Sequence, residues 1–470
     1  MSVGLFKQDA AINLHQQRVK PRSHYLWILL LSIVAQVVFL ALLPRAYRTG
    51  ESPDYTTFYG PMAQHIVDGK GFVFNGKVPD RYPPGYPVYV AAHLYAAKRL
   101  NLDPFKLITA TNILVMALSC LLIFRIAESI FTARIGLLAA FLWATYPFAL
   151  WLIPEPSTEV PFILVFTLLV WLFVRNLEAL NPMNSAVVGL LTGIAALIRP
   201  VALFVPLVLA AITLARRGFG LRHRLMCAAL IAGAFVVAIA PWETAVRVHD
   251  HRWILLSSGG SHGMLDGLTF PRNFDRGRRG HAAIPAEVVA LAQHIQASRG
   301  SLETTGDVVR FMFGELLRDP VPTLEMGILK IVRSWYATDS MQHEAPAALL
   351  QIFYLLLIVP GAWLAWGRFP EKRLAVALLL SLALYFWAIT TSVLSILRYM
   401  VPVMGLVLIF AAVGLDRIRL FHWKSRTISS DATMHELEPS GVALHASGSE
   451  RILPSKQNTD RMIIAERNVL

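Results

Sequence analysis

Long runs of apolar residues recur along this chain and alternate with shorter polar connections. A helix that rises 1.5 Å per residue needs roughly 20 apolar residues to cross about 30 Å of hydrocarbon. The predicted spans are Tyr25–Leu43, Leu107–Phe124, Ile135–Leu152, Pro156–Val174, Ala186–Ile198, Val201–Ala215, Leu225–Ala240, Ala347–Trp366, Leu374–Leu394 and Tyr399–Leu415. The pattern therefore predicts an all-α polytopic membrane protein with about ten transmembrane helices.

Residues 186–215 are either one long helix or a hairpin of two short ones. Pro206 and the Arg199-Pro200 pair interrupt this run, and a residue before a proline is pushed out of the helical region. A hairpin leaves every basic cluster on the N-terminal side of the membrane, whereas a single span would move the last three clusters outside. These clusters are Arg125/Arg134, Arg175, Arg216–Arg224, Arg368–Arg373 and Arg417–Arg426. Because cytoplasmic loops are rich in Lys and Arg, we predict the hairpin, with both termini in the cytoplasm.

The spans divide the chain into three parts. Residues 1–24 form a basic cytoplasmic segment, residues 25–420 form the transmembrane domain, and residues 421–470 form a polar tail predicted to be a disordered cytoplasmic extension. Within the domain, two long external segments, about 44–106 and 241–346, are long enough to hold structure of their own.

Both external segments show helical periodicity. In the first, Tyr55–Val67 carries an aromatic stripe that predicts a juxtamembrane helix lying on the membrane surface. In the second, Pro285–Gln296 and Gly306–Arg318 have helical periodicity, and Met326–Tyr336 is amphipathic enough to lie at the interface.

Composition supports a membrane protein and argues against other classes. Of 470 residues, 55% are hydrophobic and only 16% are charged, with a mean hydropathy of +0.53, whereas soluble domains carry about 25% charged residues. The net charge of +13 is explained by cytoplasmic loops, so nucleic-acid binding is not expected. Cys120 and Cys227 both lie inside apolar runs, which favours packing over a disulfide or a metal pair.

Candidate chemical groups lie on the external side. Asp54 opens the first external segment. Either Ser52 or Asp54 is expected to cap the Tyr55–Val67 helix, and if Asp54 is not a plain cap, it points out of the membrane edge as a functional carboxylate. Farther along, Arg81 and Tyr82 precede Pro83-Pro84-Gly85. Prolines fix φ and glycine permits close backbone approach, so this turn would hold the arginine rigidly enough to bind a phosphate.

Two arginines stand outside against the charge bias, Arg199 and Arg398, and each is either a functional residue or an interfacial anchor. Two carboxylates four residues apart, Glu155 and Glu159, are unusual so close to hydrocarbon. They would position a sugar hydroxyl, bind a cation, or pair with Arg199 or Arg398, and structural pairing is the favoured single role.

Taken in order, these residues resemble a known family, the GT-C fold glycosyltransferases of the dolichyl-phosphate-mannose protein mannosyltransferase type, which includes the bacterial aminoarabinose transferases acting on lipid A. The resemblance covers roughly residues 25–415, and the ordered set is more specific than any one motif. After Asp54 it comprises Tyr59, Ala63, Gly69, Tyr82-Pro83-Pro84-Gly85-Tyr86-Pro87, Gly189-Leu190-Leu191-Thr192-Gly193, Leu197-Ile198-Arg199-Pro200, Ala240-Pro241-Trp242 and Leu397-Arg398-Tyr399-Met400-Val401-Pro402.

The resemblance implies inverting transfer of a sugar from a polyprenyl-phosphate carrier to a glycan, lipid or protein acceptor on the outer side of the membrane. It implies Asp54 as the general base. The donor phosphate would be bound by Arg81, Tyr82, Arg199, Arg398 and Tyr399. Many relatives carry an acidic pair in the first loop, whereas Tyr55 follows Asp54 here. The second carboxylate is either supplied by Glu51, Glu155 or Glu159, or absent. The metal site therefore stays unknown, with a divalent cation as a possible cofactor.

Two other classes compete with this interpretation. A transporter or lipid flippase would need charged residues buried mid-span and internal repeats, whereas here the charged groups concentrate at span ends. A non-catalytic scaffold would keep the fold without the activity. The expected location is a bacterial inner membrane with the active site facing the periplasm; the sugar and its acceptor have no readable code in the sequence.

Overall fold

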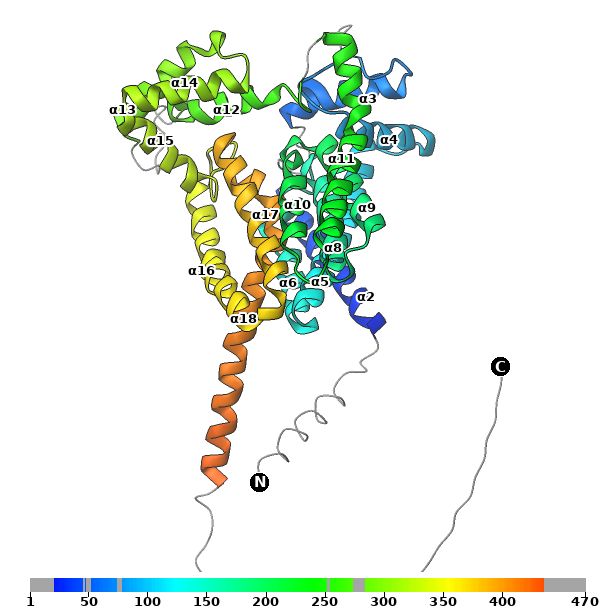
Figure 1. Cartoon of the computed structure of the whole chain (residues 1–470), viewed down its shortest axis with the longest axis vertical. Helices are drawn as coiled ribbons and strands as arrows, with labels where there is room; N and C mark the ends of the chain where they lie inside the picture. The colour runs from blue at the N-terminus through cyan, green and yellow to red at the C-terminus, as the bar shows by residue number, and fades with distance from the viewer. Residues whose placement is uncertain are drawn as a thin grey trace, which may run out of the picture. The chain divides into compact units, whose positions relative to one another are not determined.

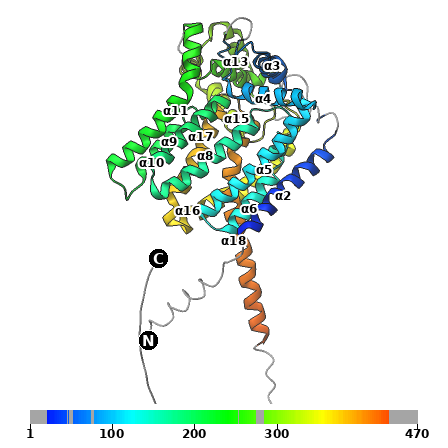
Figure 2. The ribbon, with the colours of Figure 1, turned by 90° about the vertical axis from the view of Figure 1, so that its right-hand side faces the viewer.

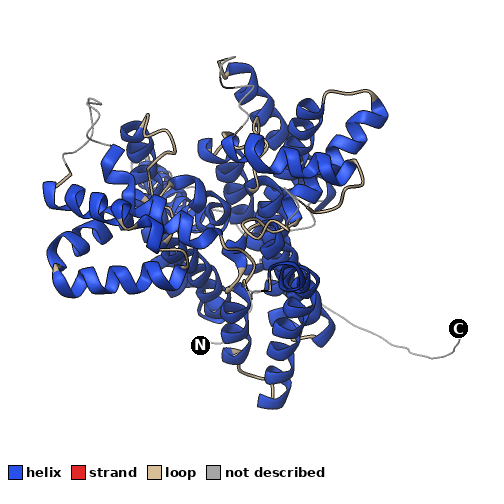
Figure 3. Cartoon of the chain, turned by 90° about the horizontal axis from the view of Figure 1, so that it is seen from above, coloured by secondary structure: helices blue, strands red, loops and turns tan. Residues whose placement is uncertain are grey.

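The computed structural model describes residues 21–44, 47, 52–73, 78–251, 254–273 and 284–434, and side chains within them to residue 418. These residues form helices and connecting loops, with no strand among them (Figures 1 and 3). Within this described part, seven helices are long and apolar enough to cross a membrane. They are α2 (Pro21–Leu42), α5 (Pro104–Ile130), α8 (Glu159–Ala179), α11 (Leu221–Asp250), α16 (Glu344–Arg368), α17 (Arg373–Ser392) and α18 (Leu397–Met434).

Three shorter apolar helices, α6 (Ala133–Ala144), α9 (Pro182–Ile198) and α10 (Val205–Ala215), complete the ten predicted spans. The predicted span Ile135–Leu152 is broken. It ends as α6, and a single turn, α7 (Pro147–Leu150), follows an extended Tyr146 with φ −70° and ψ 110°. The reason is Pro147, which disfavours helical backbone at the residue before it.

The predicted hairpin is confirmed by contacts at both ends of α8. At the end of α9, Arg199 pairs with Glu159, the first residue of α8. At the end of α10, Arg216 donates a hydrogen bond of 2.7 Å to the carbonyl of Leu177, near the last residue of α8. The 21 residues of α8 rise about 30 Å, so α9 and α10 run in opposite directions across roughly one bilayer thickness. Figure 2 shows α8, α9, α10 and α11 side by side.

The bundle has two distinct faces. We call the one where α8 begins the Glu159 face, and the opposite one the Asp416 face. At the latter, Asp416 of α18 pairs with Arg134 and Arg368 at 3.2 and 3.5 Å, and Lys372 pairs with Glu178 at 3.5 Å. Basic clusters that are far apart in sequence thus meet at one face, as the charge argument for the hairpin requires.

The external segments contribute short helices to the same unit. The first segment contains a π-helical turn η2 (Tyr55–Tyr59), α3 (Gly60–Val67) and α4 (Gly85–Leu100). The second contains α12 (Gly259–Thr269), α13 (Ala286–Ala297), α14 (Thr305–Arg318) and α15 (Pro320–Arg333), with short 3₁₀ turns η4 (Phe270–Asn273) and η5 (Arg299–Ser301). A small separate core joins α12 to α15 through Leu265, Val288, Ile295, Val308 and Met326. The remaining 3₁₀ turns are η3 (Pro200–Ala202) and η6 (Pro370–Lys372).

The aromatic stripe of the first segment does not lie on the membrane surface as predicted. Tyr55, Phe58 and Tyr59 are all at most 9% exposed, and Met62 is fully buried. The Tyr55 ring packs on Phe105 of α5 at 5.3 Å. The stripe is covered by protein because α4 and α5 supply the apolar partner that lipid headgroups would otherwise have provided.

The last helix is longer than the predicted final span. α18 continues to Met434, through the first part of the segment predicted to be disordered. No Gly or Pro occurs between Leu415 and Met434, so no residue there breaks a helix. Residues 435–470, the rest of the predicted tail, and residues 1–20 lie outside the described part of the chain.

Candidate functional site

A buried carboxylate ties two arginines together at the Glu159 face. The Glu159 side chain is fully buried, and its Oε1 lies 2.7 Å from Arg199 Nη1. Arg398 binds it with two atoms, Nε to Oε1 at 2.6 Å and Nη2 to Oε2 at 3.1 Å. This bidentate geometry is the strong form of an arginine–carboxylate pair. Of the roles that the sequence left open for Glu159, the structure therefore shows pairing with both arginines.

Local structure explains why these groups meet. Glu159 opens α8, where the positive end of the helix dipole favours a carboxylate. Arg199 leaves α9 in extended conformation, forced by Pro200, and its Nη1 also donates to Thr158 Oγ1 at 2.5 Å. Arg398 stands in the first turn of α18, where the helix dipole disfavours a cation, so the pairing with Glu159 must offset that cost.

Two tyrosines connect the arginines to Asp54. The Arg199 Cζ atom lies 5.1 Å from the centre of the Tyr399 ring. The Tyr82 hydroxyl donates to Asp54 Oδ1 at 3.4 Å, a long hydrogen bond. Burial, followed by the neighbouring Asp54 carboxylate, raises the pKa of Tyr82 to about 12, and Tyr399 contributes to the same shift. Tyr82 therefore stays protonated near neutral pH and interacts electrostatically with both Asp54 and Tyr399.

Asp54 is not a helix cap. Its backbone is helical, with φ −66° and ψ −35°, and its side chain makes no capping hydrogen bond. Ser52 takes that role, since its Oγ accepts from the Tyr55 backbone N–H at 3.2 Å. The Asp54 side chain is exposed at the start of the π-helical turn η2, a type of turn that is frequent at functional sites.

Tyr59 interacts electrostatically with both Asp54 and Arg199. Burial raises its pKa well above the ordinary value; Tyr82 and Asp54 raise it further, while Arg199 lowers it. The Tyr59 ring packs against those of Tyr82 at 5.1 Å and Tyr86 at 4.8 Å. Tyr59 therefore belongs to a cluster of aromatic side chains that is close enough to both Asp54 and Arg199 to feel their charges.

The turn carrying Arg81 and Tyr82 is held against the end of α9. A Cβ placed on Gly85 would lie 2.6 Å from the Leu197 carbonyl oxygen, two residues before Arg199. The predicted close backbone approach at Gly85 is confirmed by this contact. Arg81 itself is exposed, and its Cζ lies 5.3 Å from the centre of the Tyr82 ring.

Two further acids flank Arg398. Asp339 Oδ2 lies 3.7 Å from Arg398 Nη1, and the Asp339 side chain is 58% exposed. Partial desolvation raises the pKa of Asp339, Arg398 lowers it, and the Glu159 and Asp54 charges raise it further. Burial also raises the pKa of Glu155, which the Arg398 charge lowers. A backbone hydrogen bond from Leu397 N to the Ala337 carbonyl, 2.9 Å, fixes the Asp339 loop beside α18.

Sequence reasoning missed Asp339. It lies in a loop without periodicity between α15 and α16, and only the folded chain brings it to Arg398. By contrast, all eight residues that the sequence singled out lie at the Glu159 face or in the turn packed on it: Asp54, Arg81, Tyr82, Glu155, Glu159, Arg199, Arg398 and Tyr399.

No preformed set of metal ligands stands out at this site. Across the described residues, no group of three or more His, Cys, Asp or Glu side chains has the spacing to hold a metal ion. Glu51, one candidate for a second carboxylate, lies outside those residues.

Comparison with known proteins identifies the fold. Residues 90–242 match the family model of dolichyl-phosphate-mannose-protein mannosyltransferases. That segment contains Glu155, Glu159 and Arg199, whereas Asp54 and Arg398 lie outside it. No protein among the curated sequences matches the chain.

Two solved structures of an oligosaccharyltransferase from Archaeoglobus fulgidus resemble the chain. One, AglB in complex with an inhibitory peptide and a dolichol-phosphate, is 13% identical, with a TM-score of 0.52, over 86% of this chain and 52% of that one. The apo form is 11% identical, with a TM-score of 0.53, over 88% and 53%. The chain thus spans about half the length of these proteins.

A third similar structure is ArnT from Cupriavidus metallidurans bound to undecaprenyl phosphate. It is 16% identical, covers 83% of this chain and 78% of its own, and has a TM-score of 0.38, too low to support an argument. The apolar helices, the family match over residues 90–242 and the likeness to the oligosaccharyltransferase together show that this chain is an integral membrane protein with the GT-C fold.

Proposed function

We propose that this protein is a membrane glycosyltransferase that moves a sugar from a polyprenyl-phosphate donor to an acceptor hydroxyl, with inversion at the anomeric carbon. The observation that carries the proposal is the convergence of Asp54 with Arg199 and Arg398. These residues come from three segments far apart in sequence and meet, through Tyr82 and Tyr399, on one face of a bundle of the glycosyltransferase GT-C fold.

In the proposed reaction, Asp54 is the general base. The acceptor oxygen attacks the anomeric carbon and the bond from that carbon to the donor phosphate oxygen breaks. The acceptor proton goes to Asp54, and the bonding electron pair leaves with the lipid phosphate. A positioned base of this kind typically contributes about 10²–10⁴ in rate. The exposed carboxylate of Asp54, which accepts a long hydrogen bond from Tyr82 and does not cap its helix, supports this role.

The leaving phosphate needs positive charge fixed in advance. Arg199 and Arg398 together carry two positive charges, and Glu159 neutralises one of them while holding both guanidinium groups in place. The Asp339 carboxylate also lies 3.7 Å from Arg398. Arg81 adds an exposed guanidinium on the Tyr82 ring. Tyr399, whose ring lies against Arg199, would donate a hydrogen bond to a phosphate oxygen, and Tyr82 would do so on turning its single hydroxyl proton away from Asp54.

Glu155 and Asp339 suit a different task. Both lie near Arg398, and desolvation, which is only partial for the exposed Asp339, raises the pKa of each. Their carboxyl groups are placed to accept hydrogen bonds from sugar hydroxyls, which would orient the ring for attack. These contacts do not distinguish between a glycan, a lipid and a protein as the acceptor.

The lipid-phosphate donor is supported by the family match over residues 90–242 and by the dolichol-phosphate bound to the archaeal oligosaccharyltransferase. The basic Asp416 face fits the cytoplasm by the charge rule, so the Glu159 face and Asp54 would face the periplasm of a bacterial inner membrane, with both termini inside. The transporter alternative lacks its main support, because Glu159 and Asp416 anchor their ion pairs at the two faces rather than mid-span.

Mass spectrometry of lipid-linked and cell-surface glycans, in cells with and without the protein, tests this function. We expect deletion to remove one sugar from one class of glycoconjugate while the lipid-linked form of that sugar accumulates. Unchanged surface glycans and unchanged lipid-linked pools would contradict a transferase.

A further inference from the structure

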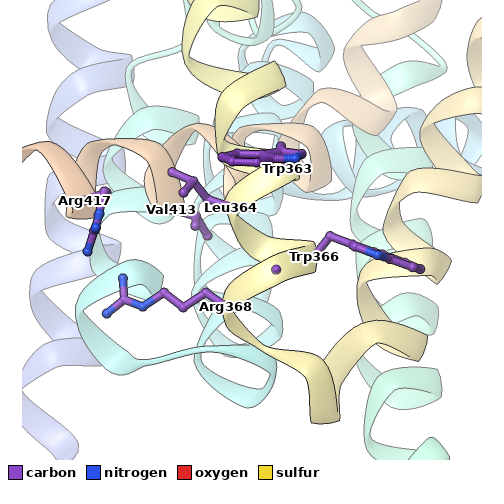
Figure 4. A pocket seen from close by; sticks show the side chains of 7 residues that line it. Trp363, Leu364, Trp366, Arg368, Val413 and Arg417 are labelled. Atoms are coloured by element: carbon purple, nitrogen blue, oxygen red, sulfur yellow. The ribbon is translucent and has the colours of Figure 1, made fainter.

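A pocket lies at the Asp416 face, away from the proposed catalytic groups. It has a volume of about 370 Å³ and is lined by Trp363, Leu364, Trp366 and Arg368 of α16 and by Val413 and Arg417 of α18 (Figure 4). Arg417 follows Arg398 by 19 residues in the same helix, which is about 28 Å along the axis. The pocket is therefore near the opposite membrane boundary, about one bilayer thickness from the proposed catalytic groups.

The pocket has more positive than negative charge. Figure 4 shows the guanidinium groups of Arg368 and Arg417 pointing toward one another. The nearby carboxylate is Asp416, which is buried and already paired with Arg134 at 3.2 Å and Arg368 at 3.5 Å. Among the described residues, no carboxylate pairs with Arg417. Two facing guanidinium groups with too few carboxylates to neutralise them favour the binding of an anion between them.

The rest of the lining fits acyl chains and the membrane interface. Trp363 is 77% exposed and ends a stripe on α16 that also includes Leu349, Leu356 and Val359, each at least 65% exposed. An exposed apolar stripe on a membrane span faces lipid, and tryptophan at its end is typical of the headgroup region. Lipid can therefore reach the arginines from the side, along α16.

Close packing of α16 on α18 makes the pocket next to their crossing. A Cβ on Gly361 would clash with the carbonyl oxygen of Phe410, and one on Gly414 would lie 3.0 Å from that of Leu357. The two helices can approach this closely only because both positions are glycine. The lining residues follow directly after this crossing on α16 and surround it on α18, so the geometry is built into the two spans.

We propose that this pocket binds the phosphodiester headgroup of an anionic glycerophospholipid from the leaflet at the Asp416 face. Arg368 and Arg417 bind the phosphate, and Trp363 with the stripe of α16 contacts the glycerol and acyl region. Basic pockets between transmembrane helices on the cytoplasmic side are suited to anionic lipid headgroups. Free phosphate could satisfy the arginines but would leave the apolar wall without a partner.

Native mass spectrometry of the delipidated, detergent-solubilised full chain tests the proposal, with dioleoyl-phosphatidylglycerol and dioleoyl-phosphatidylcholine as probes. We expect the wild type to bind phosphatidylglycerol more tightly than phosphatidylcholine. Arg417→Gln and Arg368→Gln should each lower the affinity for phosphatidylglycerol about fivefold, the effect expected when one arginine loses its contact with an anionic lipid. Arg175→Gln is the matched control. Arg175 is an exposed arginine near the end of α8 that lies at the Asp416 face, 5.3 Å from the Trp171 ring and outside the pocket.

Arg417→Gln is the decisive variant, because Arg417 is exposed and its loss leaves no described carboxylate unpaired. Equal phosphatidylglycerol binding by Arg417→Gln and Arg175→Gln would overturn the proposal. So would equal binding of the two lipids to the wild type. Displacement of phosphatidylglycerol by excess inorganic phosphate would assign the arginines to a free anion instead.

Discussion

Glu159 is the residue on which the arrangement at the Glu159 face depends most. It is fully buried, yet two arginines from α9 and α18 converge on it. A buried carboxylate is tolerated only when its charge is compensated, and removal of one partner from such a group is far more costly than loss of a surface pair. Glu159 is in this sense a positioning residue, because it fixes Arg199 and Arg398 before any substrate arrives.

We expect Glu159→Gln to destabilise the protein by about 3 kcal/mol, below the upper range for broken buried pairs because Arg398 keeps some exposure. The measurement is the melting temperature of the purified protein in detergent. Glu178→Gln is the control, since Glu178 pairs with Lys372 in an exposed position at the opposite face. Equal melting temperatures for the two variants would show that the Glu159 pair carries no structural weight.

Lys330 provides a test by pH. Its Nζ donates to the carbonyls of Ser392 and Val393 at the end of α17, both at 3.3 Å, and burial lowers its pKa to about 7 from 10.5. Between these values the unfolded chain binds more protons than the folded one, so this group's contribution to stability rises with pH from about 7 to about 10.

We therefore expect Lys330→Met to stabilise the protein relative to wild type by an amount that is largest at or below pH 7 and shrinks as pH rises. The loss of two hydrogen bonds adds a constant that does not depend on pH, so the slope is the readout. Melting temperatures of the two proteins measured across this range should converge. Parallel curves would mean that Lys330 stays charged in the folded state.

At the residue scale, sequence analysis finds candidate site residues when they are of a type that is unusual at their position in a membrane protein. Arg199 and Arg398 were found because they oppose the charge bias of the external side, and Glu155 and Glu159 because carboxylates are rare next to hydrocarbon. Asp339 is not unusual in this sense, because it is a polar residue in a polar loop. Its position beside Arg398 depends on a backbone hydrogen bond between segments 60 residues apart in sequence, Ala337 and Leu397, which no local pattern encodes.

At the scale of elements, hydrophobic length predicted the spans and proline predicted most breaks. The hairpin followed from charge distribution, and contacts at both ends of α8 agree with it. The break at Tyr146 was missed although Pro147 signals it, because the apolar run continues past the proline. The stripe from Tyr55 to Met62 was assigned to the membrane surface because periodicity reports an apolar face and not what covers it.

The packing of α4 on α9 makes an element-scale prediction. Gly85→Ala would place a methyl group 2.6 Å from the Leu197 carbonyl oxygen, so the turn with Arg81 and Tyr82 must shift away from Arg199. Overpacking of this kind costs about 1–3 kcal/mol. We expect transfer activity to fall at least tenfold while the protein still inserts and folds.

The matched control is Gly314→Ala on α14, where a new Cβ meets no atom within 4 Å and alanine favours the helix. Activity and melting temperature are measured for both variants at equal protein levels. Full activity of Gly85→Ala would show that the tight approach of the turn to α9 is dispensable.

On the scale of the whole molecule, the chain separates two kinds of chemistry by the thickness of a bilayer. The Glu159 face brings acids, arginines and tyrosines from both long external segments and from three spans into contact. The Asp416 face collects the basic clusters and the pocket between α16 and α18. Contacts between residues far apart in sequence are the feature that a sequence pattern predicts least well. For this reason the fold class was more predictable than the full site.

The central claim is that Asp54 removes the proton from the acceptor. Its most direct test is the rate at which the glycan product lost on deletion is restored by Asp54→Asn, with Asp68→Asn as an exposed control from the same segment. We predict that Asp68→Asn restores the wild-type rate, whereas Asp54→Asn, at the same level in the membrane, is slower by about 10²–10⁴. A rate for Asp54→Asn within a few-fold of wild type would contradict the account.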